Sequence, residues 1–210
     1  SPPGGRPAER PPLPSLDTAA DMYLATASTL EAAGYDHYEI SSFAKPGERA
    51  RHNSNYWRPG AAWFALGLGA TSAHRRPDSA YPASDKAKRP RTLREYEAYV
   101  DRRATPDVVL DDDDDDDDLL LNAVADDVLV SLRTRAGLPL ARLRKFAGKR
   151  VLDDVLRGAR DAIDLDLATI DRTDRLTYLR LRSPQGFLLS NSIIATIFAH
   201  LFDAPSSSSS

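Results

Sequence analysis

The 210-residue sequence contains no cysteine and a single methionine. The absence of cysteine excludes disulfides, thiolate nucleophiles and every cysteine-ligated metal centre within this chain. Long apolar runs are missing too: the longest, 61–70, is far shorter than the roughly 20 residues that a membrane-spanning helix needs. The chain begins at Ser1 rather than at a methionine, and its proline-rich opening lacks the apolar core of a signal peptide. We therefore expect a segment of a longer protein.

Acidic charge is concentrated in one place. The formal net charge is −3, but Asp111 to Asp118 is an unbroken run of eight aspartates. Without that run, 28 basic side chains face 23 acidic ones, and the rest of the chain is mildly basic. A basic body is compatible with an anionic partner such as a phosphate, a carboxylate-bearing cofactor or nucleic acid. The run itself predicts a solvated linker over 104–118. The alternative, a calcium loop, lacks the glycine and the closing glutamate.

The elements expected before the linker are typical of the last part of an α/β sheet. In a strand at 35–40, Tyr38 and Ile40 alternate with His37 and Glu39, so His37 is expected to face solvent. The segment 62–70 is apolar without alternation, as in a buried parallel strand. The other predictions are a disordered proline-rich lead-in over 1–14, a helix from Ser15 to Gly34, a basic loop over 75–91, and a helix from a Thr92–Glu95 capping box to Arg103.

The elements expected after the linker form a winged-helix-like α+β domain over 119–203. A helix over 119–134 shows apolar residues at helical spacing on one face. The segments 175–181 and 187–190 flank a turn at Ser183 to Gly186, which predicts a β-hairpin. Three further helices are predicted at 140–147, at 151–163, and from a cap at Ser190 or Asn191 to Phe202. A disordered serine tail covers 204–210.

A winged-helix domain raises the alternative of nucleic-acid binding, with wing arginines on phosphates. Arg142 to Arg150, Arg180 and Arg182 supply basic charge. Neighbouring aspartates offset much of that charge, so nucleic acid is the less favoured partner. The remaining alternatives are an interaction domain that covers the barrel mouth, and an inactive product.

One segment combines an imidazole, two amides, a phenol and an indole within six residues. These are His52, Asn53, Asn55, Tyr56 and Trp57 in HNSNYW. Such a group offers an axial nitrogen to a haem iron, aromatic faces to a porphyrin and donors to its propionates. The alternative is a structural loop, which composition alone favours. The other histidines form no metal pair with one another at helical spacing.

A second segment, LGLGA, places two glycines after the apolar run. Gly67, Gly69 and Ala70 would let the backbone approach a nucleotide closely. The alternative is a crowded strand end that admits only glycine. Composition leaves both interpretations open.

The order of these motifs carries a family resemblance. The stretch GYDHYEISSFAKPGERARHNSNYW, followed by LGLGATS, resembles the pattern of oxygen-independent coproporphyrinogen III oxidase-like radical SAM proteins, the HemW group. The later segments DDVLVSLRTRAGLPLARL and RLTYLRLRSPQGFLLSNSIIATIF are similar to the same family. The resemblance covers about 16–202. It departs from the pattern at Ser42, Ala65 and Thr71, each a polar or close-approach position.

The resemblance implies a fold and a set of site residues. It implies an α/β fold in which 15–103 are the terminal part of a partial (β/α) radical SAM barrel and 119–203 a winged-helix-like domain. The family's haem-linked HN-x-x-YW motif matches His52, Asn53, Tyr56 and Trp57, with His52 as the metal ligand. The family's glycine segment, on the S-adenosylmethionine side, matches Gly67, Gly69 and Ala70.

The resemblance also implies cofactors and partners. Haem or porphyrin and a haem-accepting protein are the expected partners. The family uses S-adenosylmethionine and a [4Fe–4S] cluster, but a chain without cysteine has no ligands for that cluster. No catalytic residue is therefore assigned. The expected compartment is the chloroplast or mitochondrion, with the cytoplasm as the alternative.

Overall fold

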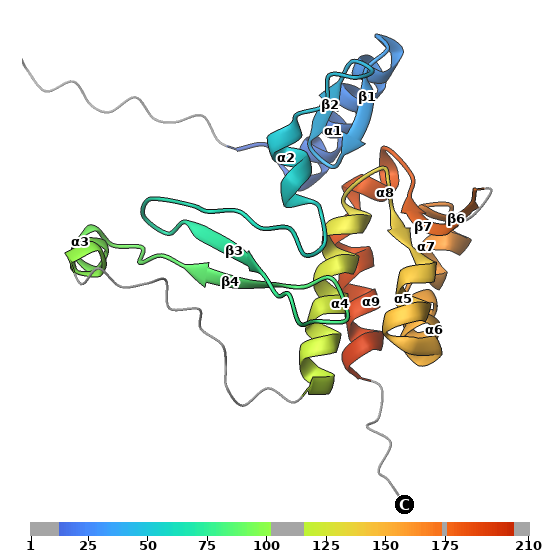
Figure 1. Ribbon diagram of the computed structural model, residues 1–210. Coiled ribbons are helices and arrows are strands. Elements are labelled where there is room, and N and C mark those ends of the chain that lie inside the picture. The colour runs from blue at the N-terminus through green and yellow to red at the C-terminus, as the bar shows by residue number, and fades with distance from the viewer. Residues whose placement is uncertain (1–12, 102–115, 174–175, 204–210) are drawn as a thin grey trace, which may run out of the picture.

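The computed structural model describes residues 13–101, 116–173 and 176–203. Within these residues the chain is mixed α/β, and its strands form three small sheets (Figure 1). Every strand pair that the structure describes is antiparallel. The described residues therefore form no closed parallel barrel. The predicted lead-in and serine tail, and most of the predicted linker, lie outside the described ranges.

The first unit pairs a long helix with a short hairpin, drawn in blue and cyan in Figure 1. The helix begins where predicted, because the Ser15 hydroxyl accepts a hydrogen bond from the Thr18 amide at 3.1 Å. It ends at Ala32, and Gly34, just after the C-cap residue, has a positive φ of 78° that suits a residue without a Cβ. The elements are α1 (Leu16–Ala32), β1 (Asp36–Glu39), β2 (Ser42–Ala44) and α2 (Arg51–Tyr56).

The prediction that His37 faces solvent is wrong. His37 is fully buried, and Tyr38 and Glu39 beside it are also buried. The register of β1 against β2 shifts between His37 and Glu39, as at a β-bulge. A bulge breaks the period-two alternation on which the prediction rested. Three successive side chains of β1, those of His37, Tyr38 and Glu39, are thus buried.

The predicted buried strand at 62–70 is also wrong. Trp63 makes an isolated bridge to Ala73, and the apolar side chains of Phe64, Leu66 and Leu68 are 65%, 75% and 51% exposed. A sheet lies later in the chain, and only its second strand falls fully within the segment 75–91 that was predicted to be a basic loop. Its strands are β3 (Thr71–Arg75) and β4 (Ser84–Lys88), and α3 (Leu93–Asp101) follows. The Thr92 hydroxyl contacts both the Glu95 amide and its carboxylate, which confirms the predicted cap.

The remaining elements surround the main core. Helices α4 and α9 lie side by side in the centre of Figure 1, with α5 and α6 beyond them. A three-stranded sheet in the order β5-β7-β6 closes one end. The elements are α4 (Asp116–Leu132), β5 (Leu138–Pro139), α5 (Leu140–Phe146), α6 (Gly148–Gly158), α7 (Arg160–Asp164), β6 (Ala168–Arg172), β7 (Thr177–Leu181), α8 (Gln185–Leu188) and α9 (Ser190–Phe202).

Three predictions in this part need correction. The partner of β7 is β6, because residues 187–188 belong to the short helix α8 instead of a strand. Helix α9 has no side-chain cap from Ser190 or Asn191, since its N-cap residue is Leu189. Helix α4 begins at Asp116, so the end of the aspartate run is helical.

The main core comes almost entirely from the second half of the chain. Among the described residues before the aspartate run, Tyr81 and Ala83 are its buried members, and Tyr23 and Ile40 pack against it partly buried. Val124, Val128 and Leu132 are fully buried on one face of α4, as their spacing predicts. The elements over 13–101 therefore pack against a core to which they contribute few buried side chains.

Candidate functional site

Helix α2 brings the predicted haem-linked residues onto two of its faces. His52 and Tyr56 are four residues apart and share one face, which is exposed. The Tyr56 hydroxyl lies 3.1 Å from His52 Nε2, and the two rings meet edge to face at 4.9 Å. Tyr56 in turn meets the ring of Trp63 at 5.0 Å. An accessible imidazole thus stands at the end of an aromatic row.

The other face of α2 borders a pocket of about 300 Å³. Asn53, Tyr56 and Trp57 line it from α2, and Glu39 and Ser41 line it from the β1–β2 hairpin. The structure therefore brings together three of the four predicted haem-linked residues, while His52 stays outside the pocket.

Glu39 is the residue of this pocket that the sequence did not single out. Its side chain is almost fully buried. The Ser41 hydroxyl donates to Oε1 at 3.3 Å, and Oε2 has no hydrogen-bond partner within the described part of the chain. The alternating pattern of β1 placed Glu39 on a solvent face. Only the bulge, which the sequence does not reveal, turns it inward.

The predicted nucleotide segment lies in the loop between α2 and β3, and its backbone amides are already engaged. Gly67 donates to the Tyr96 hydroxyl at 3.1 Å, and Gly69 donates to the Pro90 carbonyl at 2.8 Å. Ala70 donates to the Gly67 carbonyl at 3.3 Å. Positive φ values of 102° and 66° explain the need for glycine at both positions. Trp63 links this loop to Tyr56, since its indole donates to the Thr71 carbonyl.

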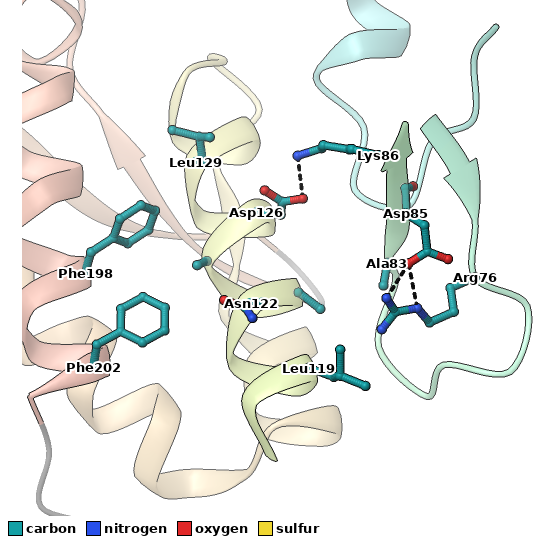
Figure 2. Close-up of a pocket in the computed structure, with 13 residues that line it drawn as sticks. Arg76, Ala83, Asp85, Lys86, Leu119, Asn122, Asp126, Leu129, Phe198 and Phe202 are labelled. Carbon is teal, nitrogen blue, oxygen red and sulfur yellow. Dashed lines mark hydrogen bonds and ion pairs between the residues drawn. The ribbon is translucent and has the colours of Figure 1, made fainter. Parts of the chain in front are cut away.

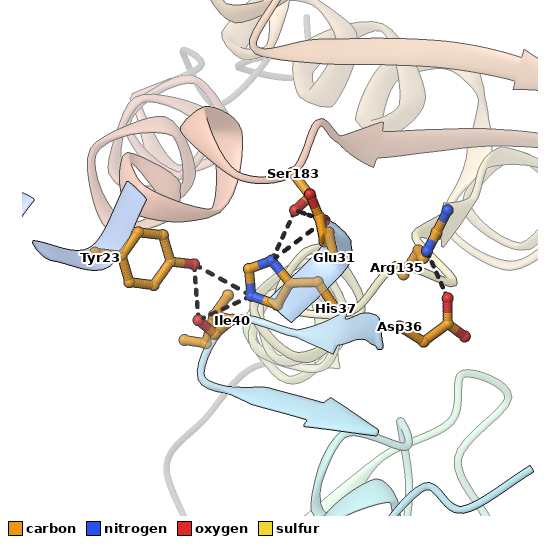
Figure 3. A network of polar contacts seen from close by, with 7 residues as sticks. All are labelled: Tyr23, Glu31, Asp36, His37, Ile40, Arg135 and Ser183. Atoms are coloured by element: carbon orange, nitrogen blue, oxygen red, sulfur yellow. Dashed lines mark hydrogen bonds and ion pairs between the residues drawn. The ribbon is translucent and has the colours of Figure 1, made fainter. Parts of the chain in front are cut away.

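A buried histidine connects the N-terminal unit to the second half of the chain (Figure 3). His37 Nδ1 lies 2.7 Å from the hydroxyl of Ser183, which donates to Glu31 at 2.9 Å. The imidazole stacks on Phe43 at 4.0 Å and meets the edge of Phe187 at 4.9 Å. Burial lowers the pKa of His37, because desolvation disfavours the imidazolium.

Tyr23 completes this network from α1. Its hydroxyl donates to the Ile40 carbonyl at 2.8 Å and lies 3.4 Å from His37 Nε2. Desolvation, followed by the charges of Glu39 and Glu31, raises the pKa of Tyr23 to about 12. The network is thus neutral at its centre, which suits packing rather than proton transfer.

A second hollow, of about 490 Å³, lies between the β3–β4 hairpin and helices α4 and α9 (Figure 2). Lys86 pairs with Asp126 at 2.6 Å across it, and Arg76 pairs with Asp85 on its hairpin side. Phe198 and Phe202 border it from α9. Its charges are paired among themselves, so no group in it points to a ligand.

The basic residues considered for nucleic acid are largely paired. The guanidinium of Arg142 holds the buried carboxylate of Asp127, and Arg180 pairs with Asp171 at 3.0 Å. Arg182 and Lys149 each pair with an aspartate as well. These pairings offset part of the positive charge on this surface, while Arg144, Lys145 and Arg150 form no ion pair with a described residue.

Comparison with known proteins identifies the class of the chain. The chain is homologous, over about nine-tenths of its length, to the HemW-like radical SAM family, and it lacks that family's cluster-binding cysteines. The chain is 28% identical over 206 residues to the heme chaperone HemW of Synechocystis, covering 90% of this chain and 46% of that protein. It is 35% identical over 187 residues to HemW of Mycobacterium tuberculosis, covering 88% of this chain and 40% of that one. The chain thus spans less than half the length of these relatives.

The fold is shared with a solved structure, the radical SAM enzyme coproporphyrinogen III oxidase (HemN) from Escherichia coli. The TM-score is 0.57 at 16% identity, over 90% of this chain and 42% of that one. At this identity the likeness concerns the fold alone. No protein-family model matches the chain. No helix within the described residues is long and apolar enough to cross a membrane.

Proposed function

We propose that this chain belongs to a haem-binding protein of the HemW kind, and that α2 supplies the contact to the haem. The observation that carries the proposal is the exposed His52 imidazole beside the rings of Tyr56 and Trp63. An exposed imidazole is open to an iron at its free nitrogen, and neighbouring rings pack on the porphyrin plane. The relatives named as heme chaperones support the choice of haem over other flat ligands.

The residues around α2 fit haem in two further respects. Arg51 and Arg58, near the two ends of the helix, form no ion pair within the described ranges, so their charges are available to propionates. His52 is the only metal ligand that the proposal needs. The described residues hold no cluster of three or more His, Asp or Glu suited to a metal ion. Haem then acts as cargo held by one axial nitrogen.

The proposal assigns the two halves of the chain to two parts of a radical SAM protein. In it, 15–103 form the terminal part of the partial radical SAM barrel, and 119–203 form a winged-helix-like domain whose wing is the β6–β7 hairpin. The likeness to part of the HemN fold supports this division.

The other cofactors of the family fit less well. The iron–sulfur cluster has no ligand in a chain without cysteine, so no radical chemistry is assigned here. The amides of Gly67, Gly69 and Ala70 donate within the chain, so they are not free to bind S-adenosylmethionine. The proposal is therefore haem binding and transfer to an accepting protein, without oxidation of coproporphyrinogen.

Titration with haem tests this proposal. We expect a Soret band that shifts and sharpens on binding, and we expect His52→Ala to weaken binding by about tenfold or more. His200→Ala is the matched control, because His200 lies far along the sequence on α9 and its Nδ1 contacts the Thr196 carbonyl. An identical Soret titration for His52→Ala and the unaltered chain would reject His52 as the ligand.

A further inference from the structure

The pocket beside α2 is lined by a buried carboxylate, Glu39, of which one oxygen has no hydrogen-bond partner among the described residues. Glu39 is 2% exposed, and its Oε2 makes no hydrogen bond within the described part of the chain. No lysine or arginine of the described ranges forms an ion pair with it. A buried carboxylate whose oxygens are incompletely hydrogen-bonded is unfavourable, because it has lost its hydration without full compensation. Such a group is retained at a functional site more readily than in a packing role.

A guanidinium that contacts one of the pocket residues is directed elsewhere. Arg133 lies over the ring of Trp57 at 6.0 Å and donates to Asn191 Oδ1 at 2.7 Å. Its own Nε is buried without a partner. The protein thus places a cation against the outer wall of the pocket without neutralising the carboxylate in it.

The other walls of the pocket have the chemistry of a cation site. Tyr56 and Trp57 supply aromatic faces, which attract a positive charge through their π-electrons. Ser41 and Asn53 supply neutral polar groups. A volume of about 300 Å³ is at the small end of ligand pockets. A haem propionate is excluded from it by like charge, so the occupant is a different molecule from the proposed haem.

We infer that this pocket binds an organic cation, an ammonium or guanidinium group, that donates to Glu39 Oε2 between the rings of Tyr56 and Trp57. Charge-assisted hydrogen bonds of this kind are among the stronger polar contacts. The cation belongs either to a free small molecule or to a lysine or arginine side chain of a protein partner. The inference goes beyond haem binding and does not require it.

The test is titration of the whole chain with n-propylguanidinium, followed by the amide NMR shifts of Ser41 and Asn53. The matched ligand control is n-propylurea, which has a closely similar shape without the charge. We expect saturable shifts with the guanidinium and none with the urea. Equal shifts with both ligands, or none with either, would overturn the inference.

Variants locate the contact. Glu39→Gln keeps the shape of the side chain and removes its charge, and we expect it to weaken guanidinium binding by about tenfold or more. Glu97→Gln is the control, because Glu97 is exposed on α3 and forms no ion pair with any residue that the structure describes. Trp57→Leu should also weaken binding, through loss of an aromatic wall. A Glu39→Gln chain that binds as tightly as the unaltered chain contradicts the proposal.

Stability gives an independent readout. Removing an unpaired buried charge should leave the urea midpoint of Glu39→Gln unchanged or higher. A clear fall in the urea midpoint would mean that the carboxylate is structural, which would overturn the inference.

A pair of peptides identifies the source of the cation. Binding of acetyl-Gly-Arg-Gly-amide is compared with binding of the same peptide carrying citrulline in place of arginine. Binding of the arginine peptide indicates a protein partner, and binding of free propylguanidinium alone indicates a small molecule.

Discussion

At the scale of single residues, the chain buries several polar groups, and their partners distinguish structural from functional roles. Asp127 on α4 is fully buried, and it accepts hydrogen bonds from Tyr81 at 2.6 Å, Ser131 at 2.6 Å and Arg142 at 2.8 Å. Burial and the Asp127 charge raise the pKa of Tyr81, so its phenol stays protonated and donates. Asp127 is therefore satisfied, whereas Glu39 is not.

This contrast predicts a large effect on stability for Asp127. Asp127→Asn should lower the free energy of unfolding by about 3 kcal/mol, because Arg142 loses its charged partner in a buried site. Urea unfolding followed by far-UV circular dichroism measures the change. Asp126→Asn is the control, since Asp126 pairs with Lys86 at the surface, and it should stay within about 1 kcal/mol. Equal losses for the two variants would contradict the structural role of the buried network.

The residue scale also shows which part of the site the sequence could indicate. The HNSNYW motif singled out the α2 residues through their side-chain chemistry and the family resemblance, although the helix that carries them was not predicted. Glu39 was not identified, since its burial depends on a bulge in β1 and on contacts from distant elements. The same bulge buries His37. Tertiary contacts of this kind leave no local pattern in the chain.

At the scale of elements, the helices were easier to predict than the strands. The apolar spacing of α4 and the caps of α1 and α3 are local signals, and all three helices appear near their expected positions. Whether a segment forms a strand depends on the partner with which it pairs, and the sequence does not identify that partner. The apolar run 62–70 predicts a strand, but Phe64 and Leu66 are exposed and belong to no strand pair of the described residues. Helix α8 was missed because four residues are too short for a periodic signal.

Packing between elements yields a second prediction. A Cβ on Gly158 of α6 would lie 2.6 Å from the Ile197 Cα of α9, so the two helices touch through backbone. Gly158→Ala should lower the free energy of unfolding by about 1–3 kcal/mol through overpacking. Urea titration measures it, with Arg150→Ala on the exposed face of α6 as the control, expected within about 0.5 kcal/mol. An unchanged midpoint for Gly158→Ala would show that the helices do not approach this closely.

At the scale of the whole molecule, the N-terminal unit is joined to the main core through the His37 network. Ser183, in the segment after β7, and Phe187 of α8 contact the imidazole across the junction. The neutral imidazole is the form that this buried setting accepts, and its folded-state pKa is lowered. The folded state therefore holds fewer protons than the unfolded chain near the ordinary histidine pKa.

A pH dependence follows from this linkage. The stabilising contribution of neutral His37 is present above the unfolded-state pKa of about 6.5 and is lost as the pH falls below it. We expect the urea midpoint to fall between pH 7.5 and 5.5, and to fall less steeply for His37→Phe, which keeps the stack on Phe43. His200→Ala should retain the full slope. Parallel slopes for His37→Phe and the unaltered chain would assign the pH dependence to other groups.

The length of the chain relative to its homologues determines which functions are assigned to it. The chain spans less than half of the HemW relatives that it matches, so the activity of a complete protein of this family is not assigned to it. Its compartment stays a prediction, the chloroplast or mitochondrion with the cytoplasm as the alternative. What the chain itself carries is the α2 imidazole and its aromatic neighbours.

The most direct measurement of that claim is chemical rescue of the axial ligand. In the His52→Gly chain, the position of the ring is left open, and free imidazole is added during haem titration. We predict that His52→Gly loses the sharpened Soret band of the bound form, and that imidazole restores it, whereas the unaltered chain changes little with imidazole at the same concentration. A Soret band that persists in His52→Gly without imidazole would contradict haem ligation by this helix.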